Sequence, residues 1–482
     1  MLLARFVLGL NRKVMETNLA KMNDASTGQE KTIYSLDDIG NAVMLASIFQ
    51  NRIRYCEDLR SWLVWDGKHL AKNDVTLWRH ARLIVRIRFH QAKSKYNLVT
   101  TNGIVVSKED VLKWAIKSAS KARMQAMLDV ASILPQMATK LKELDKDEYL
   151  FNCQNGTIDL RTGELRKHNL SDMLTHISDV SYRPDAPCPE WLKFVEDITL
   201  GNWHLQEYLQ EVLGYCLCGS VSEQIMFVLV GKGANGKSTF LNAFINVLGT
   251  YAKTTPAHTF VKSESRALRN DLARLVGARF VSAVEINSGK KLDEALVKGL
   301  SGGDRVAARF IGKEFFEYTP QAKFFLAVNV FPEVSGADDG IYRRLRVIPF
   351  DAAFAPHQMD KDKPAKLKKE AEGILAWAVE GFKRWYERKS LLEPEVVTEA
   401  SMAFREQMDA VRSFIDDYCI LDPGASVQVG SLYDAYIEWA KQNALEPMSK
   451  KQFGTHVGQK GFTQGKSGKT RSWKGLKFIV MP

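Results

Sequence analysis

Residues 225–238, IMFVLVGKGANGKS, consist of an apolar run, a glycine-rich turn and a Lys-Ser pair. The apolar run predicts a buried strand, and the residues from 237 to 248 predict a helix. The spacing of Gly231, Gly236, Lys237 and Ser238 is that of a phosphate-binding P-loop. This stretch therefore predicts an α/β fold in which a strand, a loop and a helix bind a nucleoside triphosphate.

Each part of the predicted loop has a chemical role. Gly231 and Gly236 should allow backbone conformations that turn successive N–H groups towards phosphate oxygens. Lys237 brings a positive charge to the β- and γ-phosphates, and Ser238 offers a hydroxyl to Mg²⁺. The following helix places its positive end at the same anion. The predicted ATP-binding residues are Gly231, Lys232, Gly233, Ala234, Asn235, Gly236, Lys237, Ser238 and Thr239.

The charge of the chain favours a polyanionic partner. The 482 residues carry a net charge of +11, and 45% of them are hydrophobic, as is usual for a folded globular protein. Residues 441–482 hold nine Lys or Arg and one Glu, and the run from Arg79 to Lys95 holds six and no acid. Nucleic acid is the first partner that such clusters fit, and an anionic membrane is the second. For either cluster alone, a solvated face is an equal alternative.

The cysteines and the apolar segments bear on the compartment. Six scattered cysteines show no C-x₂-C pair and no nearby histidine pair, which argues against a zinc ribbon and against a disulfide framework. In the opening MLLARFVLGL, Arg5 interrupts the apolar run, so an N-terminal helix is expected rather than a signal peptide. Because no stretch approaches 18 apolar residues, we expect a soluble, cytoplasmic protein without membrane contact.

The element pattern divides the chain into five parts. The residues around Asp66-Gly67 predict a strand-turn-strand at 62–70, and helical patterns fill much of the rest of the N-terminal part. The turn signals Asn155-Gly156 and Thr162-Gly163 predict a hairpin at 152–165. Helical segments are predicted at 191–218 and 364–392, and alternating strands and helices after the P-loop imply a mainly parallel sheet. A helix, a strand, two helices and two strands around a basic turn give the last part the pattern of a winged helix. The predicted parts are an N-terminal mainly helical domain (1–150), a hairpin and proline-rich connector (151–190), the ATPase core (191–355), a helical lid (356–410) and a winged-helix domain (411–482).

Four residues after the P-loop are candidates for catalysis. Glu285 ends a predicted strand, where such enzymes place the acid that holds Mg²⁺ or polarises water; an exposed strand-end carboxylate is the alternative. Asn329 follows another strand and could reach the γ-phosphate or the water, although asparagine also forms turns. Arg343 and Arg344 could supply an arginine finger to a neighbouring subunit, or form an ion pair with Asp338 or Asp339.

Four segments in order carry a family resemblance. They are GANGKST, FVSAVE, VKGLSGGDRVAARFIGKEFFEYTPQAKFFLAVN and DDGIYRRLRVIPF. Together they resemble the core of superfamily 3 DNA helicases, and specifically the phage and plasmid primase–helicase family related to poxvirus NTPase-primases. The resemblance extends through NCQNGTIDLRTGEL, YRPDAPCPEWLKFV and GILAWAVEGF to the predicted winged helix. It covers residues 36–480 and implies an AAA+-like ATPase core.

The resemblance also implies residue roles. Residues 231–239 match motif A, Glu285 belongs to motif B, Asn329 is the sensor of motif C, and Arg344 is the arginine finger. Motif B′ begins with Lys298, Gly302, Gly303 and Asp304. A hairpin after Asp304, with Arg309 and Lys313 near its tip, is similar to the one that touches single-stranded DNA in the channel of hexameric relatives. The catalytic set is thus Lys237, Glu285, Asn329 and Arg344, with Ser238 and Glu285 on Mg²⁺. The predicted DNA contacts are Lys298, Arg309, Lys313, Lys450, Lys451, Lys469 and Arg471, with Lys460 and Lys466 beside them.

Two departures from the family pattern limit these expectations. Val284 and Ile286 flank Glu285, so the paired acids of many members are missing. Few residues precede the shared region, so we expect no N-terminal primase domain. The sequence predicts an ATP- and Mg²⁺-dependent helicase of a phage, plasmid or other mobile element, forming a homohexamer on single-stranded or forked DNA, with a separate primase or host replication proteins as further partners. An origin-binding or loader ATPase that remodels DNA without processive unwinding is the alternative, and a nucleotide or small-molecule kinase is the third interpretation.

Overall fold

The computed structural model describes residues 30–262, 270–284, 291–329, 334, 339–407, 410–443, 445, 447–467 and 470–479. The helix predicted for MLLARFVLGL lies outside these residues. The chain divides into two compact units, one of residues 1–158 and 165–177 and the other of residues 159–164 and 178–482. Within the described ranges, no helix combines the length and the apolar character that a membrane-spanning segment requires.

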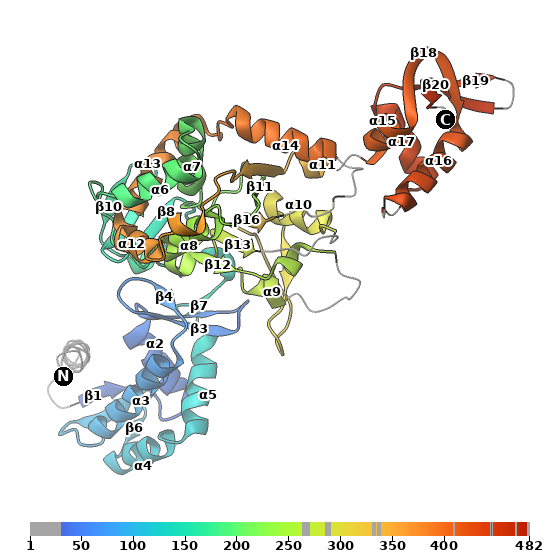
Figure 1. The fold of residues 1–482 in the computed structure, drawn as a ribbon. Coiled ribbons are helices and arrows are strands. Elements are labelled where there is room, and N and C mark those ends of the chain that lie inside the picture. The colour runs from blue at the N-terminus through green and yellow to red at the C-terminus, as the bar shows by residue number, and fades with distance from the viewer. Residues whose placement is uncertain are drawn as a thin grey trace. The chain divides into compact units, whose positions relative to one another are not determined.

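The first unit packs helices against short strands (Figure 1). Its helices start at capping residues: the Asp37 carboxylate accepts a hydrogen bond from the Gly40 N–H, and the Ser107 hydroxyl accepts one from the Asp110 N–H. The helices are α2 (Asp38–Phe49), α3 (Asp74–Gln91), α4 (Lys108–Ser118) and α5 (Lys121–Ser132). The strands are β1 (Glu30–Ile33), β2 (Ile53–Cys56), β3 (Ser61–Trp65), β4 (Leu70–Ala71), β5 (Asn97–Thr100), β6 (Val105–Val106), β7 (Ala138–Thr139), β8 (Leu150–Cys153), β9 (Gly156–Asp159) and β10 (Glu164–Arg166).

These strands form three small sheets, in the orders β1-β5-β6, β4-β3-β2-β7 and β10-β9-β8. The predicted strand-turn-strand at 62–70 and the predicted hairpin at 152–165 are confirmed as β3–β4 and β8–β9–β10. Asn152 is fully buried: its amide donates to the Lys68 carbonyl at 2.9 Å and accepts from the Thr157 hydroxyl at 3.1 Å. This asparagine therefore joins the two turns, because a buried amide must satisfy its polar atoms.

The second unit contains a five-stranded sheet whose pairings are all parallel. The strand order is β12-β13-β16-β11-β17, and Figure 1 shows β11, β16, β13 and β12 in this succession. Every residue of β16 is buried, which fits a strand that is covered on both faces. The strands are β11 (Met226–Val230), β12 (Ala252–Thr254), β13 (Phe280–Val284), β16 (Lys323–Val328) and β17 (Leu345–Pro349). The predicted parallel sheet is confirmed, with β12 as a strand that the sequence did not reveal.

Helices surround this sheet. The helical segments predicted at 191–218 and 364–392 are confirmed, and α13 packs against α7 and α8. The helices are α6 (Pro189–Ile198), α7 (Trp203–Tyr215), α8 (Lys237–Leu248), α9 (Asn270–Ala273), α10 (Glu294–Gly302), α11 (Asp339–Tyr342), α12 (Lys363–Lys369), α13 (Ala371–Arg388) and α14 (Glu395–Gln407). A separate antiparallel hairpin consists of β14 (Val306–Ala308) and β15 (Phe316–Tyr318).

The C-terminal segment has its own hydrophobic core, built around Phe414, Tyr436, Trp439, Phe453 and Trp473. Each element predicted for it is present. The elements are α15 (Ala410–Tyr418), β18 (Cys419–Gln428), α16 (Val429–Gln442), α17 (Lys450–Gln459), β19 (Thr463–Ser467) and β20 (Thr470–Phe478), with the antiparallel strand order β18-β20-β19. The winged-helix assignment and the five domain boundaries stay predictions.

Candidate nucleotide and nucleic-acid site

The glycine-rich loop 231–236 joins the carboxyl end of β11 to the first residue of α8. Gly236 has φ +87°, a conformation that L side chains rarely adopt, which agrees with the prediction. Gly231 has no such positive φ. Glycine is needed there for space, because a Cβ atom would overlap the Asn235 amide and the Phe350 carbonyl. The expected reason for Gly231 is corrected accordingly, from backbone conformation to close approach.

Lys237 is the buried cation of this loop, with a side chain that is 7% exposed. Its ammonium donates to the Gly231 carbonyl at 2.7 Å, to the Asn235 side-chain oxygen at 3.1 Å and to the Asn329 side-chain oxygen at 3.3 Å. Burial lowers the pKa of Lys237 from its ordinary value, because desolvation disfavours the charged form. A partly desolvated ammonium at the amino end of a helix without a side-chain cap forms a strongly anion-attracting centre.

The strand order brings Asn329 to this centre. Val230, the last residue of β11, pairs with Val328, the last residue of β16, so Asn329 emerges beside Gly231. On the other side of β16, Val284 of β13 pairs with Ala327. Glu285 follows Val284 in the chain but lies outside the described residues, so its role in catalysis and metal binding stays a prediction.

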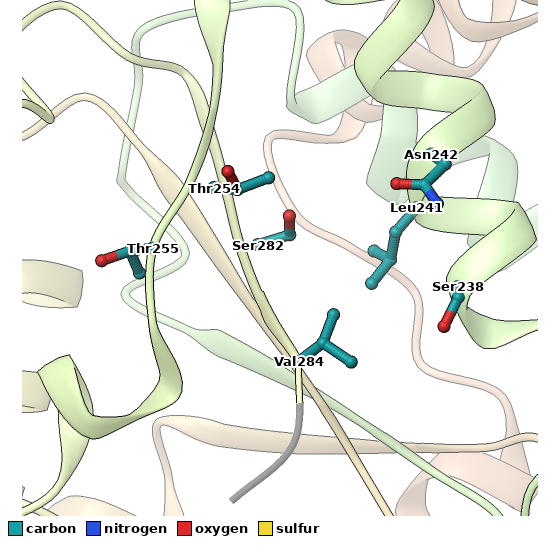
Figure 2. Close-up of a pocket in the computed structure, with 7 residues that line it drawn as sticks. All are labelled: Ser238, Leu241, Asn242, Thr254, Thr255, Ser282 and Val284. Carbon is teal, nitrogen blue, oxygen red and sulfur yellow. The ribbon is translucent and has the colours of Figure 1, made fainter.

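A pocket of about 290 Å³ flanks Ser238 (Figure 2). One wall comes from α8, and the other comes from the carboxyl ends of β12 and β13. The lining residues are Ser238, Leu241, Asn242, Thr254, Thr255, Ser282 and Val284. Four of these carry hydroxyl groups, of which the Thr255 hydroxyl is paired with the Thr259 hydroxyl at 2.9 Å, and Ser238 is the one next to the loop.

The donor chemistry of this pocket fits Mg²⁺. This hard cation prefers oxygen ligands and usually keeps several waters, taking one or two protein ligands plus substrate phosphates. Ser238 supplies such an oxygen at the first turn of α8. Among the residues that the structure describes, no group of three or more His, Cys, Asp or Glu side chains could hold a metal by itself. Besides Ser238 and the predicted ligand Glu285, a Mg²⁺ ion at this position would take phosphate and water oxygens, as it does with nucleotides.

Arg343 and Arg344 lie at the amino ends of the parallel strands, whereas the glycine-rich loop lies at their carboxyl ends. Arg344 precedes the first residue of β17, and its carbonyl accepts a hydrogen bond from the N–H of Met226 at the start of β11 at 2.7 Å. The five residues of β11 separate this end of the sheet from the loop, a distance of roughly 16 Å. The Arg344 guanidinium donates to the Gly340 carbonyl at 3.2 Å, whereas the Arg343 side chain is exposed. Neither arginine can reach the loop of the same chain.

The hairpin of β14 and β15 exposes apolar side chains at its tip. Ile311 is 78% exposed and Phe315 is 61% exposed, which is unusual for large hydrophobic residues. The Arg309 guanidinium lies 4.6 Å from the centre of the Phe315 ring, so it supports this ring by a cation–π contact. Lys313 is exposed beside them. The predicted phosphate contact of Arg309 stays a prediction, and the structure adds its packing on Phe315.

The basic residues of the C-terminal segment lie on α17 and on the β19–β20 hairpin. Lys450 and Lys451 are exposed in the first turn of α17, where the helix dipole disfavours cations unless an external anion is present. Lys466 pairs across the strands with Arg471, and both side chains are exposed. Lys469 lies outside the described residues. Lys298, which was also predicted to contact DNA, lies on α10 and is half-buried, far in sequence from the basic residues of the C-terminal segment.

Sequence reasoning missed three features of the site. The strand β12 and the residues after it supply the hydroxyls of Thr254 and Thr255. The Asn235 amide anchors the loop by donating to the Phe350 carbonyl at 3.1 Å. Phe315 forms an exposed aromatic surface at the hairpin tip. Only Phe315 had a sequence signal, because FIGKEFF places aromatic residues on both sides of a glycine turn. The six cysteines are free and buried.

Comparisons with known proteins place these features in a family. Residues 42–200 match the family described as D5 N terminal like, residues 229–344 match a family of unknown function, and residues 406–474 match the family described as poxvirus D5 protein-like. A protein of Acanthamoeba polyphaga mimivirus, provisionally named a helicase, is 29% identical over 331 residues, which is 63% of this chain and 34% of the relative. A provisionally named primase of African swine fever virus is 21% identical over 523 residues, which is 99% of this chain and 53% of the relative.

The chain thus spans about a third to a half of the length of these two relatives. Among solved structures, the apo C-terminal region of NrS-1 is similar in fold, with a TM-score of 0.50 at 9% identity, covering 91% of this chain and all of that chain. The two D5 family matches lie on either side of the glycine-rich loop, and the viral relatives agree with them. These matches support a D5-type primase–helicase family for this chain.

Proposed function

We propose that this chain is an ATP-dependent DNA helicase that acts in the replication of a virus, phage, plasmid or other mobile element. The observation that carries the proposal is the convergence of Lys237, Asn329 and the amino end of α8 at one edge of a parallel sheet. Ligands of open α/β sheets bind at the carboxyl ends of the strands, where these groups lie. The helicase and primase names of the viral relatives support the choice of DNA as the substrate class.

Lys237 and the N–H groups of the loop and of α8 bind the β- and γ-phosphates in this proposal. Asn329 orients the γ-phosphate or the attacking water, because its side-chain oxygen already lies 3.3 Å from the Lys237 ammonium. Mg²⁺, held by Ser238 with Glu285 as the predicted second ligand, supplies charge neutralisation when bound. The N–H groups of the loop and of the first turn of α8 provide fixed dipoles, so little reorganisation is required during hydrolysis.

Oligomerisation completes the site. Because the arginines lie roughly 16 Å from the loop of their own subunit, an arginine that acts on ATP must come from a neighbour. A ring with one nucleotide between successive subunits meets this requirement through a head-to-tail interface. We propose a homohexamer that encloses a single DNA strand, with Arg344 as the finger and the β14–β15 hairpin facing the strand.

Strand displacement tests this function directly. The full chain, incubated with ATP, Mg²⁺ and a forked DNA duplex, should release the displaced strand, and single-stranded DNA should stimulate its ATPase activity. Stimulated hydrolysis without displacement would favour an origin-binding or loader ATPase, for which the exposed lysines of α17 are suited. Hydrolysis that DNA leaves unchanged would contradict both interpretations and favour a kinase.

Substitutions at the hairpin tip should weaken the coupling of hydrolysis to unwinding. In Phe315→Ala and Lys313→Ala variants we expect lower affinity for single strands, by about tenfold for Phe315, because stacking of one base contributes about 1–3 kcal/mol. Unwinding per ATP hydrolysed should fall in both. Anisotropy titrations and parallel ATPase and displacement assays measure these effects.

Glu317→Ala is the matched control for the hairpin, because Glu317 is exposed on β15 and away from the tip. This variant should bind and unwind like the wild type. If the Phe315 and Lys313 variants also unwind at the wild-type rate, the hairpin does not contact the strand.

A further inference from the structure

Helix α3 of the first unit has one buried face and one basic face. Leu77, Ala81, Ile84 and Val85 are buried, whereas Arg79, Arg82 and Arg86 are exposed. Spacings of three and four residues place the three arginines on one side of the helix. The exposed residues of this side include no acid, because the one acidic residue of α3 is Asp74 in its first turn. We call Arg79, Arg82 and Arg86 the α3 basic stripe.

The fourth arginine of α3, Arg88, has a structural role that the three arginines of the stripe lack. Arg88 is fully buried, and its guanidinium donates to the Asn41 side-chain oxygen at 2.8 Å and to the Tyr34 carbonyl at 2.9 Å. Similarly, Arg123 of α5 forms an ion pair with Asp38 at 2.6 Å. Within the described residues, the three arginines of the stripe have no corresponding ion-pair partner. Their charges are therefore not used to hold this unit together.

Three uncompensated arginines on adjacent turns are unfavourable for the isolated helix. Like charges at spacings of three or four residues destabilise a helix by about 0.2–0.5 kcal/mol for each pair. The stripe contains two such pairs, Arg79 with Arg82 and Arg82 with Arg86. A bound polyanion reverses the sign of this contribution, because each guanidinium then has a negative partner.

The spacing of the stripe matches a nucleic-acid backbone. Arg79 and Arg86 are seven positions apart on the helix, which is roughly 10 Å at 1.5 Å per residue. Phosphates of one duplex strand succeed each other every 3.4 Å or so along the axis, so about three of them fall within this length. Guanidinium groups bind phosphate oxygens in a bidentate manner, which suits arginine better than lysine for this contact.

We propose that the α3 basic stripe is a sequence-independent binding surface for the phosphate backbone of DNA. It goes beyond the proposed function, because α3 belongs to the unit that contains none of the nucleotide-site residues. The stripe contributes affinity for DNA outside the ATPase core, and this contribution does not depend on ATP hydrolysis.

The test is equilibrium binding without nucleotide, using the full chain with Arg79→Gln, Arg82→Gln and Arg86→Gln combined. Anisotropy of labelled single-stranded and duplex DNA is measured over a range of salt concentrations. Each phosphate contact contributes about 0.7 to the slope of log K against log salt on single strands, so the slope should fall by about two units. Circular dichroism and thermal unfolding establish that the variant is folded.

The control combines Lys361→Gln, Lys368→Gln and Lys369→Gln, which removes the same formal charge from exposed positions at α12. Its salt slope should equal that of the wild type. Equal slopes for the stripe variant and this control would overturn the proposal. Weaker binding of polyglutamate with unchanged DNA binding would also overturn it and would assign the stripe to an acidic protein. Because no ATP is present, failure of the proposed helicase activity would leave this result unaffected.

Discussion

Lys237→Ala should abolish ATP hydrolysis and weaken ATP binding, whereas Glu285→Gln should abolish hydrolysis and leave binding intact. The Lys237 ammonium is buried against the loop and Asn329, so its loss removes a charge from the phosphate site itself. A hydrogen bond to a charged group contributes about 1.5–3 kcal/mol, so the Kd for ATP should rise by about tenfold or more. In the proposed mechanism the Glu285 carboxylate acts on metal and water, so the glutamine variant should trap bound ATP.

Lys232→Ala is the matched control for Lys237, because Lys232 belongs to the same loop but its side chain is exposed. Its backbone N–H is retained in alanine, so ATP affinity and turnover should change by no more than a few fold. Equilibrium titration with a fluorescent ATP analogue and phosphate-release assays separate the two effects. Equal loss of ATP affinity in the Lys237 and Glu285 variants would show that Glu285 does not have the predicted role.

Mixing Arg344→Ala subunits with Lys237→Ala subunits should restore ATPase activity that neither variant has alone. Removal of an arginine finger lowers turnover by about 10³-fold or more, so each homomeric variant should be close to inactive. In a ring, each site combines the loop of one subunit with the arginine of the next. A site is intact when its loop comes from an Arg344→Ala subunit and its arginine comes from a Lys237→Ala subunit. With random mixing in equal amounts, about a quarter of the sites meet both conditions. About a quarter of the wild-type activity is therefore expected if the sites act independently.

The control mixture combines Lys237→Ala with Glu285→Gln, since both substitutions affect the same half of the site. No mixed interface is then intact, and no activity should return. The same experiment with Arg343→Ala decides between the two arginines, of which Arg343 is the more exposed. Absence of recovery for both arginines, in preparations where mixed oligomers have been verified by mass spectrometry, would contradict a finger that acts in trans.

Much of the fold and of the candidate site could be predicted because their signals are local. The apolar run before the glycine-rich loop, the glycine at 236 and the lysine at 237 depend on neighbours within one turn of chain, and each was found where it was expected. Turn residues likewise predicted the hairpin at 152–165. The short strand β12 was missed, since three residues carry too little periodicity to distinguish a strand.

The sequence by itself determined the loop chemistry, the alternation of strands and helices, and the family resemblance. Only the tertiary structure decided which distant residues meet: Asn329 lies beside Lys237 because β16 pairs with β11, and Arg344 lies away from them because β17 pairs with β11 in parallel. It also separated arginines that look alike in the sequence, with Arg88 buried among acceptors and Arg79 exposed. The physical reason is that strand order and burial depend on packing between segments far apart in the chain, whereas propensity and spacing report interactions over a few residues.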